Sequence, residues 1–142
     1  MSSAQSGVVL ISRYMESVLN GDYATMSELL SDQLLHNLSR SGIEVKMATK
    51  EDAIQYAKDT GKVDVRFLDV FESGDKVVCR YEYTISGEVV PGAQPGTSTN
   101  VTGIAIVRIE NGKIREIWQE QDVLGMLLGL GMTVLRPEAR QQ

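Results

Sequence analysis

A single histidine dominates the chemistry that this chain could carry out. His36 and the adjacent Asn37 directly follow Leu34 and Leu35, at the point where a short helical pattern gives way to a strand. A neutral imidazole can accept or donate a proton near neutral pH, so His36 is a candidate acid–base catalyst. The alternative is a structural histidine, hydrogen-bonded to the backbone at the rim of the fold. Any catalysis that uses a histidine must therefore run through His36.

Three tyrosines and the only cysteine could add polar groups to the same site. Tyr14 interrupts an amphipathic helical pattern with a phenol that could stabilise an enolate oxygen by hydrogen bonding. Alternatively, its ring packs against a sheet with the hydroxyl at the surface. Tyr81 and Tyr83 share one face of a predicted strand with Cys79, because side chains alternate along a strand. Cys79 is predicted to be a small buried hydrophobic residue rather than a nucleophile.

The segment 113–122 carries polar groups on both of its predicted faces. One face holds Ile114, Glu116, Trp118, Glu120 and Asp122, and the other holds Lys113, Arg115, Ile117, Gln119 and Gln121. If the carboxylates face inward, a buried acid with a raised pKa becomes available. If the amides face inward, the pocket is neutral and only forms hydrogen bonds, while the carboxylates are solvated and Trp118 lies at a subunit contact. Both faces are mixed, so the periodicity leaves the choice open.

Size and composition limit the classes of protein that the chain can represent. With 142 residues and 15.6 kDa, we expect one domain over residues 1–142, large enough to enclose a pocket without disulfides or metal. The net charge of −5 and the pI near 4.9 argue against nucleic-acid binding. One Cys and one His exclude a Cys/His zinc cage and an intramolecular disulfide.

The sequence indicates neither a cofactor nor a membrane segment. The run GMLLGLG, over 125–131, lacks the glycine spacing and the lysine of a phosphate-binding loop, and we expect no nucleotide, flavin or metal. The N-terminal MSSAQSG lacks the basic region of a signal peptide. No apolar run approaches the ~20 residues that a membrane helix needs, so we expect a cytoplasmic protein.

Helical patterns precede strand patterns along the chain. Helices are predicted over 8–19, over a short segment from 23 that ends at 31–32, from a Thr49 cap to about 59, and within 123–131, with a flexible tail after about 132. Strands are predicted over 63–73, 76–86, 97–110 and 113–122, with hairpin turns at 73–75 and 111–112. This order predicts an α+β fold, with a curved, mainly antiparallel sheet wrapped around the N-terminal helices as a cone. A pocket is expected inside the open cone.

The run VTGIAIVRIENGKIREIWQEQDVLGMLLGLG, over 101–131, carries a family resemblance. It is similar to the closing hairpin and tail of SnoaL-like polyketide cyclases. Upstream, the segments 20–22, 36–37 and 95–97 resemble features of that family and of the wider nuclear transport factor 2-like superfamily. The resemblance implies a conical α+β barrel, a pocket for a small hydrophobic molecule, a homodimer formed through the sheet, and Gln119 and Gln121 facing inward.

The resemblance also implies roles for individual positions. Where these cyclases carry a catalytic histidine and aspartate, the chain has Ala105 and Gln119, which cannot titrate. In comparison with ketosteroid isomerases, Tyr14 matches the tyrosine that binds the oxyanion, whereas Asn37 replaces the general base and Ala105 the second acid. The Asp-Arg-Asp set of related epoxide hydrolases cannot be assembled from the predicted strands.

The residues and the resemblance together predict a cyclase or isomerase of polyketide-like or other hydrophobic secondary metabolites. It would use hydrogen bonds and one histidine for proton transfer, without metal or nucleotide. The expected catalytic residues are His36, Tyr14 and Gln119. The expected substrate-binding residues are Asn37, Tyr81, Tyr83, Ala105, Ile117, Trp118 and Gln121. The alternative is a non-catalytic protein of the same fold that binds a small hydrophobic ligand.

Overall fold

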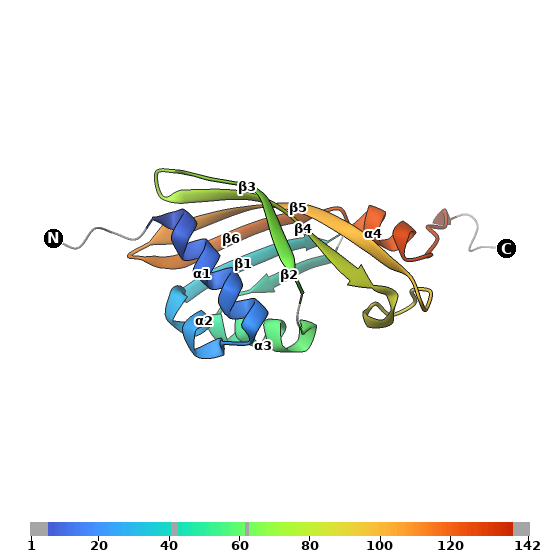
Figure 1. The fold of residues 1–142 in the computed structure, drawn as a ribbon, viewed down its shortest axis with the longest axis horizontal. Helices are drawn as coiled ribbons and strands as arrows, with labels where there is room; N and C mark the ends of the chain where they lie inside the picture. Colours follow the sequence, from blue (N-terminus) through green and yellow to red (C-terminus); the bar gives the residue numbers. More distant parts are fainter. Residues whose placement is uncertain (1–5, 41–42, 62, 138–142) are drawn as a thin grey trace.

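One six-stranded sheet forms the frame of the protein, and three helices cover one of its faces (Figure 1). The computed structural model describes residues 6–40, 43–61 and 63–137. The strand order is β2-β1-β6-β5-β4-β3. The elements are α1 (Gly7–Asn20), α2 (Tyr23–Leu29), β1 (Leu30–Arg40), β2 (Ile43–Met47), α3 (Lys50–Thr60), β3 (Val65–Ser73), β4 (Lys76–Ser86), the 3₁₀ turn η1 (Gly87–Val89), β5 (Ser98–Glu110), β6 (Lys113–Gln121) and α4 (Val123–Gly129). The predicted α+β architecture is confirmed.

Local sequence signals set the ends of the first three helices. Ser6 caps α1 by accepting a hydrogen bond from the Val9 N–H, and Gly21 ends it in the left-handed conformation at φ 68°. Thr49 caps α3 at the predicted position, with acidic residues in the first turn. The buried face of α1 presents Leu10 and Tyr14 to the sheet, four residues apart as on one side of a helix, so Tyr14 belongs to this face and does not interrupt it as the sequence predicts.

Strands β3 to β6 form the antiparallel meander that the sequence predicts. Asn111 and Gly112 adopt positive φ values of 54° and 73° in the turn between β5 and β6, as a tight hairpin turn requires. Residues of β4 and β5 pair without a register shift from Lys76↔Arg108 to Ser86↔Ser98. This long, regular hairpin fixes which side chains of the two strands face inward.

The other half of the sheet differs from the prediction. Ser31 and Asp32, expected to end a helix, lie inside β1, which begins at Leu30. β1 forms an antiparallel hairpin with β2 that the sequence pattern does not reveal, and it pairs in parallel with β6. The parallel pairing joins segments about eighty residues apart, for example His36 with Ile117, so no local signal indicates it. The sheet is therefore mixed.

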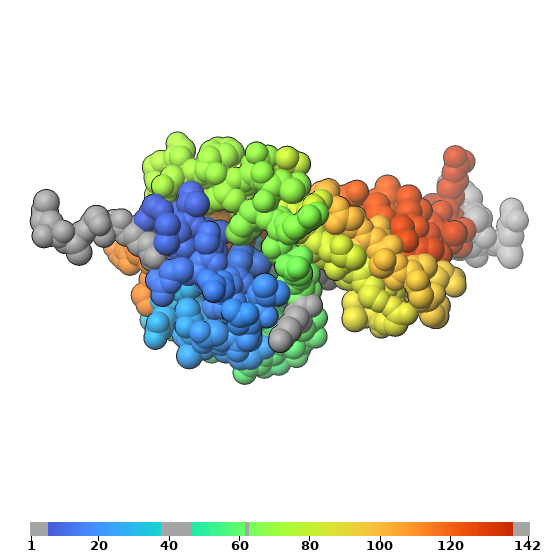
Figure 2. Space-filling model, in the orientation of Figure 1, coloured from blue at the N-terminus to red at the C-terminus, as the bar shows by residue number. Residues whose placement is uncertain are grey.

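The hydrophobic core lies between the helices and the sheet. An extension formed by the far ends of β4 and β5, η1 and α4 projects beyond the part of the molecule that the first three helices cover (Figure 2).

None of the helices in the described residues could span a membrane. The prediction of a flexible tail falls partly on residues 138–142, which lie outside the described part of the chain. The fully buried side chains are Leu10, Met26, Leu30, Leu34, Val77, Val101, Ile114 and Leu130.

Candidate functional site

A cavity of about 220 Å³ lies between the helices and the inner face of the sheet. Its volume is small compared with pockets for drug-sized ligands. Among the described lining residues there is no Asp, Glu, Lys or Arg. The wall is mostly apolar, and its polar side chains are Tyr14, His36, Tyr56, Thr60, Tyr81, Tyr83, Gln119 and Gln121.

A break in the alternation of β6 decides which of its faces lines the cavity. Ile114 and Ile117 are both buried, although strict alternation would place them on opposite faces. The pairing with β5 shifts between Ile114 and Glu116, so the inward parity changes there. Beyond this bulge, Ile117, Gln119 and Gln121 line the cavity. The inward orientation of the two glutamines agrees with the family resemblance.

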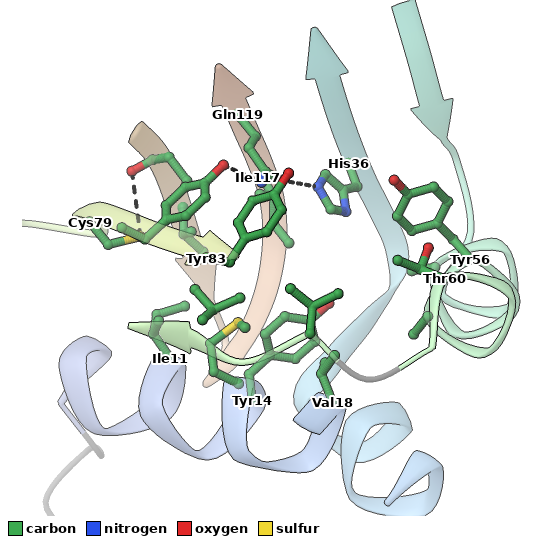
Figure 3. A pocket seen from close by; sticks show the side chains of 18 of the residues that line it. Ile11, Tyr14, Val18, His36, Tyr56, Thr60, Cys79, Tyr83, Ile117 and Gln119 are labelled. Atoms are coloured by element: carbon green, nitrogen blue, oxygen red, sulfur yellow. Dashed lines mark hydrogen bonds between the residues drawn. The ribbon is translucent and has the colours of Figure 1, made fainter. Parts of the chain in front are cut away.

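A chain of hydrogen bonds joins the polar side chains of three strands (Figure 3). His36 Nε2 on β1 donates to Gln119 Oε1 on β6 at 2.9 Å. Gln119 Nε2 donates to the Tyr81 hydroxyl on β4. The Tyr81 and Tyr83 hydroxyls both donate to Gln121 Oε1, at 3.3 Å and 2.9 Å. Five side chains, distant in sequence, thus form one polar strip on an otherwise apolar wall.

The environment of His36 keeps its imidazole neutral. The side chain is buried, and this desolvation lowers its pKa, against a smaller opposing effect from the hydrogen bond with Gln119. Because Nε2 is the donor to Gln119, Nδ1 carries the lone pair. Nδ1 is buried and has no hydrogen-bond partner among the described residues. A buried acceptor without a partner is unfavourable, and such groups often mark functional sites.

Tyr14 brings a hydroxyl to the cavity from the helix side. Its side chain is buried on α1, on the side opposite the strands that carry His36 and Gln119 (Figure 3). Desolvation raises the Tyr14 pKa well above its ordinary value, so the phenol stays protonated and can donate. The alternative of a hydroxyl at the surface is thereby excluded, because Tyr14 is buried and lines the cavity.

Small residues on β5 make room for the polar strip. Gly103 faces inward, and a Cβ there would collide with the Tyr81 hydroxyl and lie 2.8 Å from the backbone oxygen of Glu120. Ala105 lines the cavity beside Cys79, whose thiol donates to the Ala105 carbonyl at 3.8 Å. Burial raises the Cys79 pKa to about 11, so the thiol is protonated at neutral pH. It acts as a small buried hydrophobic residue, as the sequence predicts.

Two predicted substrate-binding residues lie outside the cavity lining. Asn37 is buried on the opposite face of β1 from His36, because adjacent strand residues point to opposite faces. Trp118 is 46 % exposed on the outer face of β6, between the inward-facing Ile117 and Gln119. Both assignments are therefore corrected. The other predicted site residues, Tyr81, Tyr83, Ala105, Ile117 and Gln121, line the cavity together with His36, Tyr14 and Gln119.

Helix α3 contributes lining residues that the sequence analysis does not identify. Ala53, Tyr56, Ala57 and Thr60 all line the cavity. Their spacing of three and four residues is the signal of one helix face, and it could have indicated them. In the described part of the chain, no three His, Cys, Asp or Glu side chains are grouped so that they could hold a metal ion.

Comparison with known proteins identifies the family. The profile of the SnoaL-like polyketide cyclases matches residues 8–130, which is most of the chain. The chain belongs to the SnoaL-like polyketide cyclase family. A comparison with curated proteins finds no match for this SnoaL-like protein.

Solved structures share the fold of this SnoaL-like protein at low sequence identity. IdmH from Streptomyces antibioticus, described as a candidate polyketide cyclase, is 20% identical with a TM-score of 0.74 and matches 90% of this chain and 100% of its own. A candidate SnoaL-like polyketide cyclase from Jannaschia sp. CCS1 is 17% identical with a TM-score of 0.73, and the match covers 94% of this chain and 100% of the other. An LEH-like epoxide hydrolase from M. tuberculosis is 14% identical with a TM-score of 0.69, and the match covers 87% of each chain. The nuclear transport factor 2-like fold is thus shared by proteins described with different activities.

Proposed function

We propose that this SnoaL-like protein is a cofactor-independent cyclase or isomerase of a small, neutral, hydrophobic metabolite of the polyketide type. The observation that carries the proposal is a buried neutral imidazole, with an unpartnered Nδ1 among the described residues, inside a cavity that also holds the Tyr14 hydroxyl. Family membership supports the cyclase class.

The uncharged lining supports a neutral substrate. Moving a carboxylate or an ammonium group out of water into this cavity would cost several kcal/mol, because no charged side chain of the described lining could compensate it. A carbonyl or hydroxyl group needs only a hydrogen-bond partner, and the lining offers such groups, among them the Tyr14 hydroxyl and the Gln121 amide. The apolar remainder of the wall suits a hydrocarbon ring or chain.

His36 and Tyr14 divide the chemistry between a base and a hydrogen-bond donor. His36 Nδ1 accepts a proton from a carbon next to a carbonyl group, and the electron pair of that C–H bond moves to form the enolate. The Tyr14 hydroxyl donates a hydrogen bond to the enolate oxygen and stabilises the developing charge. The proton then returns from His36 to another carbon in an isomerisation, or to the new oxygen in an aldol cyclisation.

A non-catalytic binding protein is the second candidate. The chain holds Ala105 and Gln119 at the positions where the family resemblance implies a catalytic histidine and aspartate. The hydroxyl protons of Tyr81 and Tyr83 are also engaged with Gln121, so the strip forms a stable binding surface. These features favour recognition of a ligand over chemistry on it.

Isotope exchange separates the two candidates without the natural substrate. β-Tetralone is a small neutral ketone whose α-protons are acidified by the carbonyl group and the ring. In D₂O, the wild-type protein is expected to accelerate deuterium incorporation at these carbons above the buffer rate, as followed by NMR, and His36→Gln is expected to abolish the acceleration. Binding of β-tetralone without any acceleration would support the binding protein instead.

We also propose that the outer face of the sheet forms a homodimer contact. An apolar row crosses four strands at one register, from Phe71 through Val78 and Ile106 to Trp118. Phe71, Ile106 and Trp118 are 57%, 42% and 46% exposed. The family resemblance implies a dimer through the sheet, and a second copy of this exposed apolar row is the occupant that would match it.

A further inference from the structure

The hydrogen bonds of the polar strip all run in one direction. Gln119 uses its amide nitrogen to donate to Tyr81, so its carbonyl oxygen faces His36 and accepts from Nε2. The Tyr81 oxygen accepts from Gln119, and its proton therefore points onward to Gln121. Along the series from His36 through Gln119 and Tyr81 to Gln121, the donor in each hydrogen bond is the residue nearer to His36.

The strip ends in different groups at its two ends. At the buried end, His36 Nδ1 offers only a lone pair. At the other end, Gln121 Oε1 accepts from both Tyr81 and Tyr83, which occupies its two lone pairs. The amide nitrogen of Gln121 makes no hydrogen bond among the described residues, and Gln121 is partly exposed and lines the cavity. Its two N–H groups are the donors that a ligand can meet.

We propose that Gln121 is a specificity-determining residue, whose amide N–H groups bind an oxygen acceptor, such as a ketone carbonyl, on a neutral ligand. This inference rests on the proposed function only in assigning the cavity to a small neutral ligand. Hydrogen bonds in a series polarise one another, so the strip strengthens the terminal donor. A ligand that presents a hydroxyl proton at this position finds no free acceptor on Gln121.

The direction of the strip has a direct spectroscopic test. The chain has one histidine, so the imidazole nitrogens give unambiguous ¹⁵N signals. At about pH 8, where a histidine is neutral, long-range ¹H–¹⁵N spectra are expected to show the proton on Nε2. The opposite tautomer would reverse each hydrogen bond and place the carbonyl oxygen of Gln121 toward the ligand. A predominant proton on Nδ1, or an equal mixture of tautomers, overturns the proposal.

Binding of three probes of similar shape tests the specificity. We would measure the affinities of β-tetralone, β-tetralol and the hydrocarbon tetralin by NMR titration of the wild type, Gln121→Met and Gln121→Glu. Gln55→Met is the matched control, since Gln55 is exposed on α3 and outside the lining. Loss of one neutral hydrogen bond corresponds to about a threefold to tenfold change in affinity.

The wild type and Gln55→Met are expected to bind β-tetralone about threefold to tenfold more tightly than tetralin, since only the ketone can accept the hydrogen bond from Gln121. Gln121→Met is expected to lose the preference while it keeps tetralin binding. Gln121→Glu, which presents an acceptor instead of a donor, is expected to favour β-tetralol. Equal preference for the ketone in the wild type and Gln121→Met, or no binding of any probe by the wild type, overturns the proposal. If the wild type and the variants show these binding preferences but the wild type does not accelerate isotope exchange, only the proposed catalysis is refuted.

Discussion

The imidazole of His36 is buried in a cavity whose described lining holds no charged side chain. A protonated imidazole would have no counter-charge in this lining, so its neutral form predominates, and the neutral form is the one that can act as a base. Gln119 orients the ring through Nε2 and leaves Nδ1 as the basic atom. Gln119 cannot titrate, but it orients the titratable His36 through this hydrogen bond.

The burial of His36 predicts a specific pH dependence of stability. An unfolded chain protonates histidine near pH ~6.5, whereas the folded protein protonates His36 only at lower pH, since burial lowers its pKa. Between these two pKa values the unfolded state binds more protons, so the free energy of unfolding falls as the pH decreases. The free energy of unfolding of the wild type and of His36→Gln can be measured with denaturant from about pH 8 to 5.5. Relative to His36→Gln, the value for the wild type is expected to fall by up to about 1.4 kcal/mol per pH unit. If the free energies of unfolding of the wild type and of His36→Gln changed with pH in the same way, this account would be contradicted.

Removing one oxygen from Tyr14 is expected to separate activity from stability. Tyr14→Phe deletes the donor to the enolate, and loss of such a donor costs about a hundredfold or more in rate. The hydroxyl makes no hydrogen bond in the described part of the chain, so the free energy of unfolding should change by less than about 1 kcal/mol. Isotope exchange and denaturant unfolding of the same sample check both expectations. An unchanged exchange rate would remove Tyr14 from the mechanism.

At the scale of the strands, close packing between β4 and β5 holds the polar strip in place. Gly103→Ala inserts a methyl group where the Tyr81 hydroxyl lies, against the Glu120 backbone. Overpacking of this kind costs about 1–3 kcal/mol, and we expect the displaced hydroxyl to weaken the Nε2–H preference of His36. Unfolding curves and imidazole ¹⁵N spectra measure the two effects. Thr102→Ala, at the adjacent exposed position, is the control, and an equal response of both variants would argue against the strip.

The strands also show how far the sequence could predict the site. Alternation correctly groups Tyr81 and Tyr83 with Cys79, because β4 is regular over its whole length. It fails on β6, because the bulge after Ile114 shifts the inward parity partway along the strand. Because both faces of this strand are mixed, alternation also leaves the choice of inner face open, and the predicted site includes Trp118 although Ile117 and Gln119 on either side of it occupy the inner face.

Long-range pairing accounts for the remaining errors. The helices and the meander follow from local caps, turns and periodicity, and their predicted bounds agree with the structure to within about two residues. The parallel contact of β1 with β6 depends on tertiary packing, and β2 is too short to give a clear pattern. His36 and Gln119 could be singled out from the sequence, but the hydrogen bond between them required the fold.

At the scale of the whole molecule, the apolar row on the outer face predicts the assembly. Trp118→Glu places a charge at one end of the proposed contact, and truncating a tryptophan that anchors an interface typically weakens it by about 2 kcal/mol or more. Light scattering is expected to report a dimer for the wild type and a monomer for this variant. Leu128→Glu, on α4 and 54% exposed, is expected to remain dimeric. A monomeric wild type at working concentration would contradict the proposed dimer.

The central claim, proton transfer by His36, is tested most directly by the pH dependence of isotope exchange. The pKa of the one imidazole can be measured by NMR in the same protein that exchanges the α-protons of β-tetralone. The exchange rate should rise with pH through a single ionisation that coincides with the His36 pKa, below the ordinary value of about 6.5. His36→Gln should lack this ionisation and the acceleration. A wild-type rate that does not follow the His36 titration, or a full rate in His36→Gln, would contradict the account.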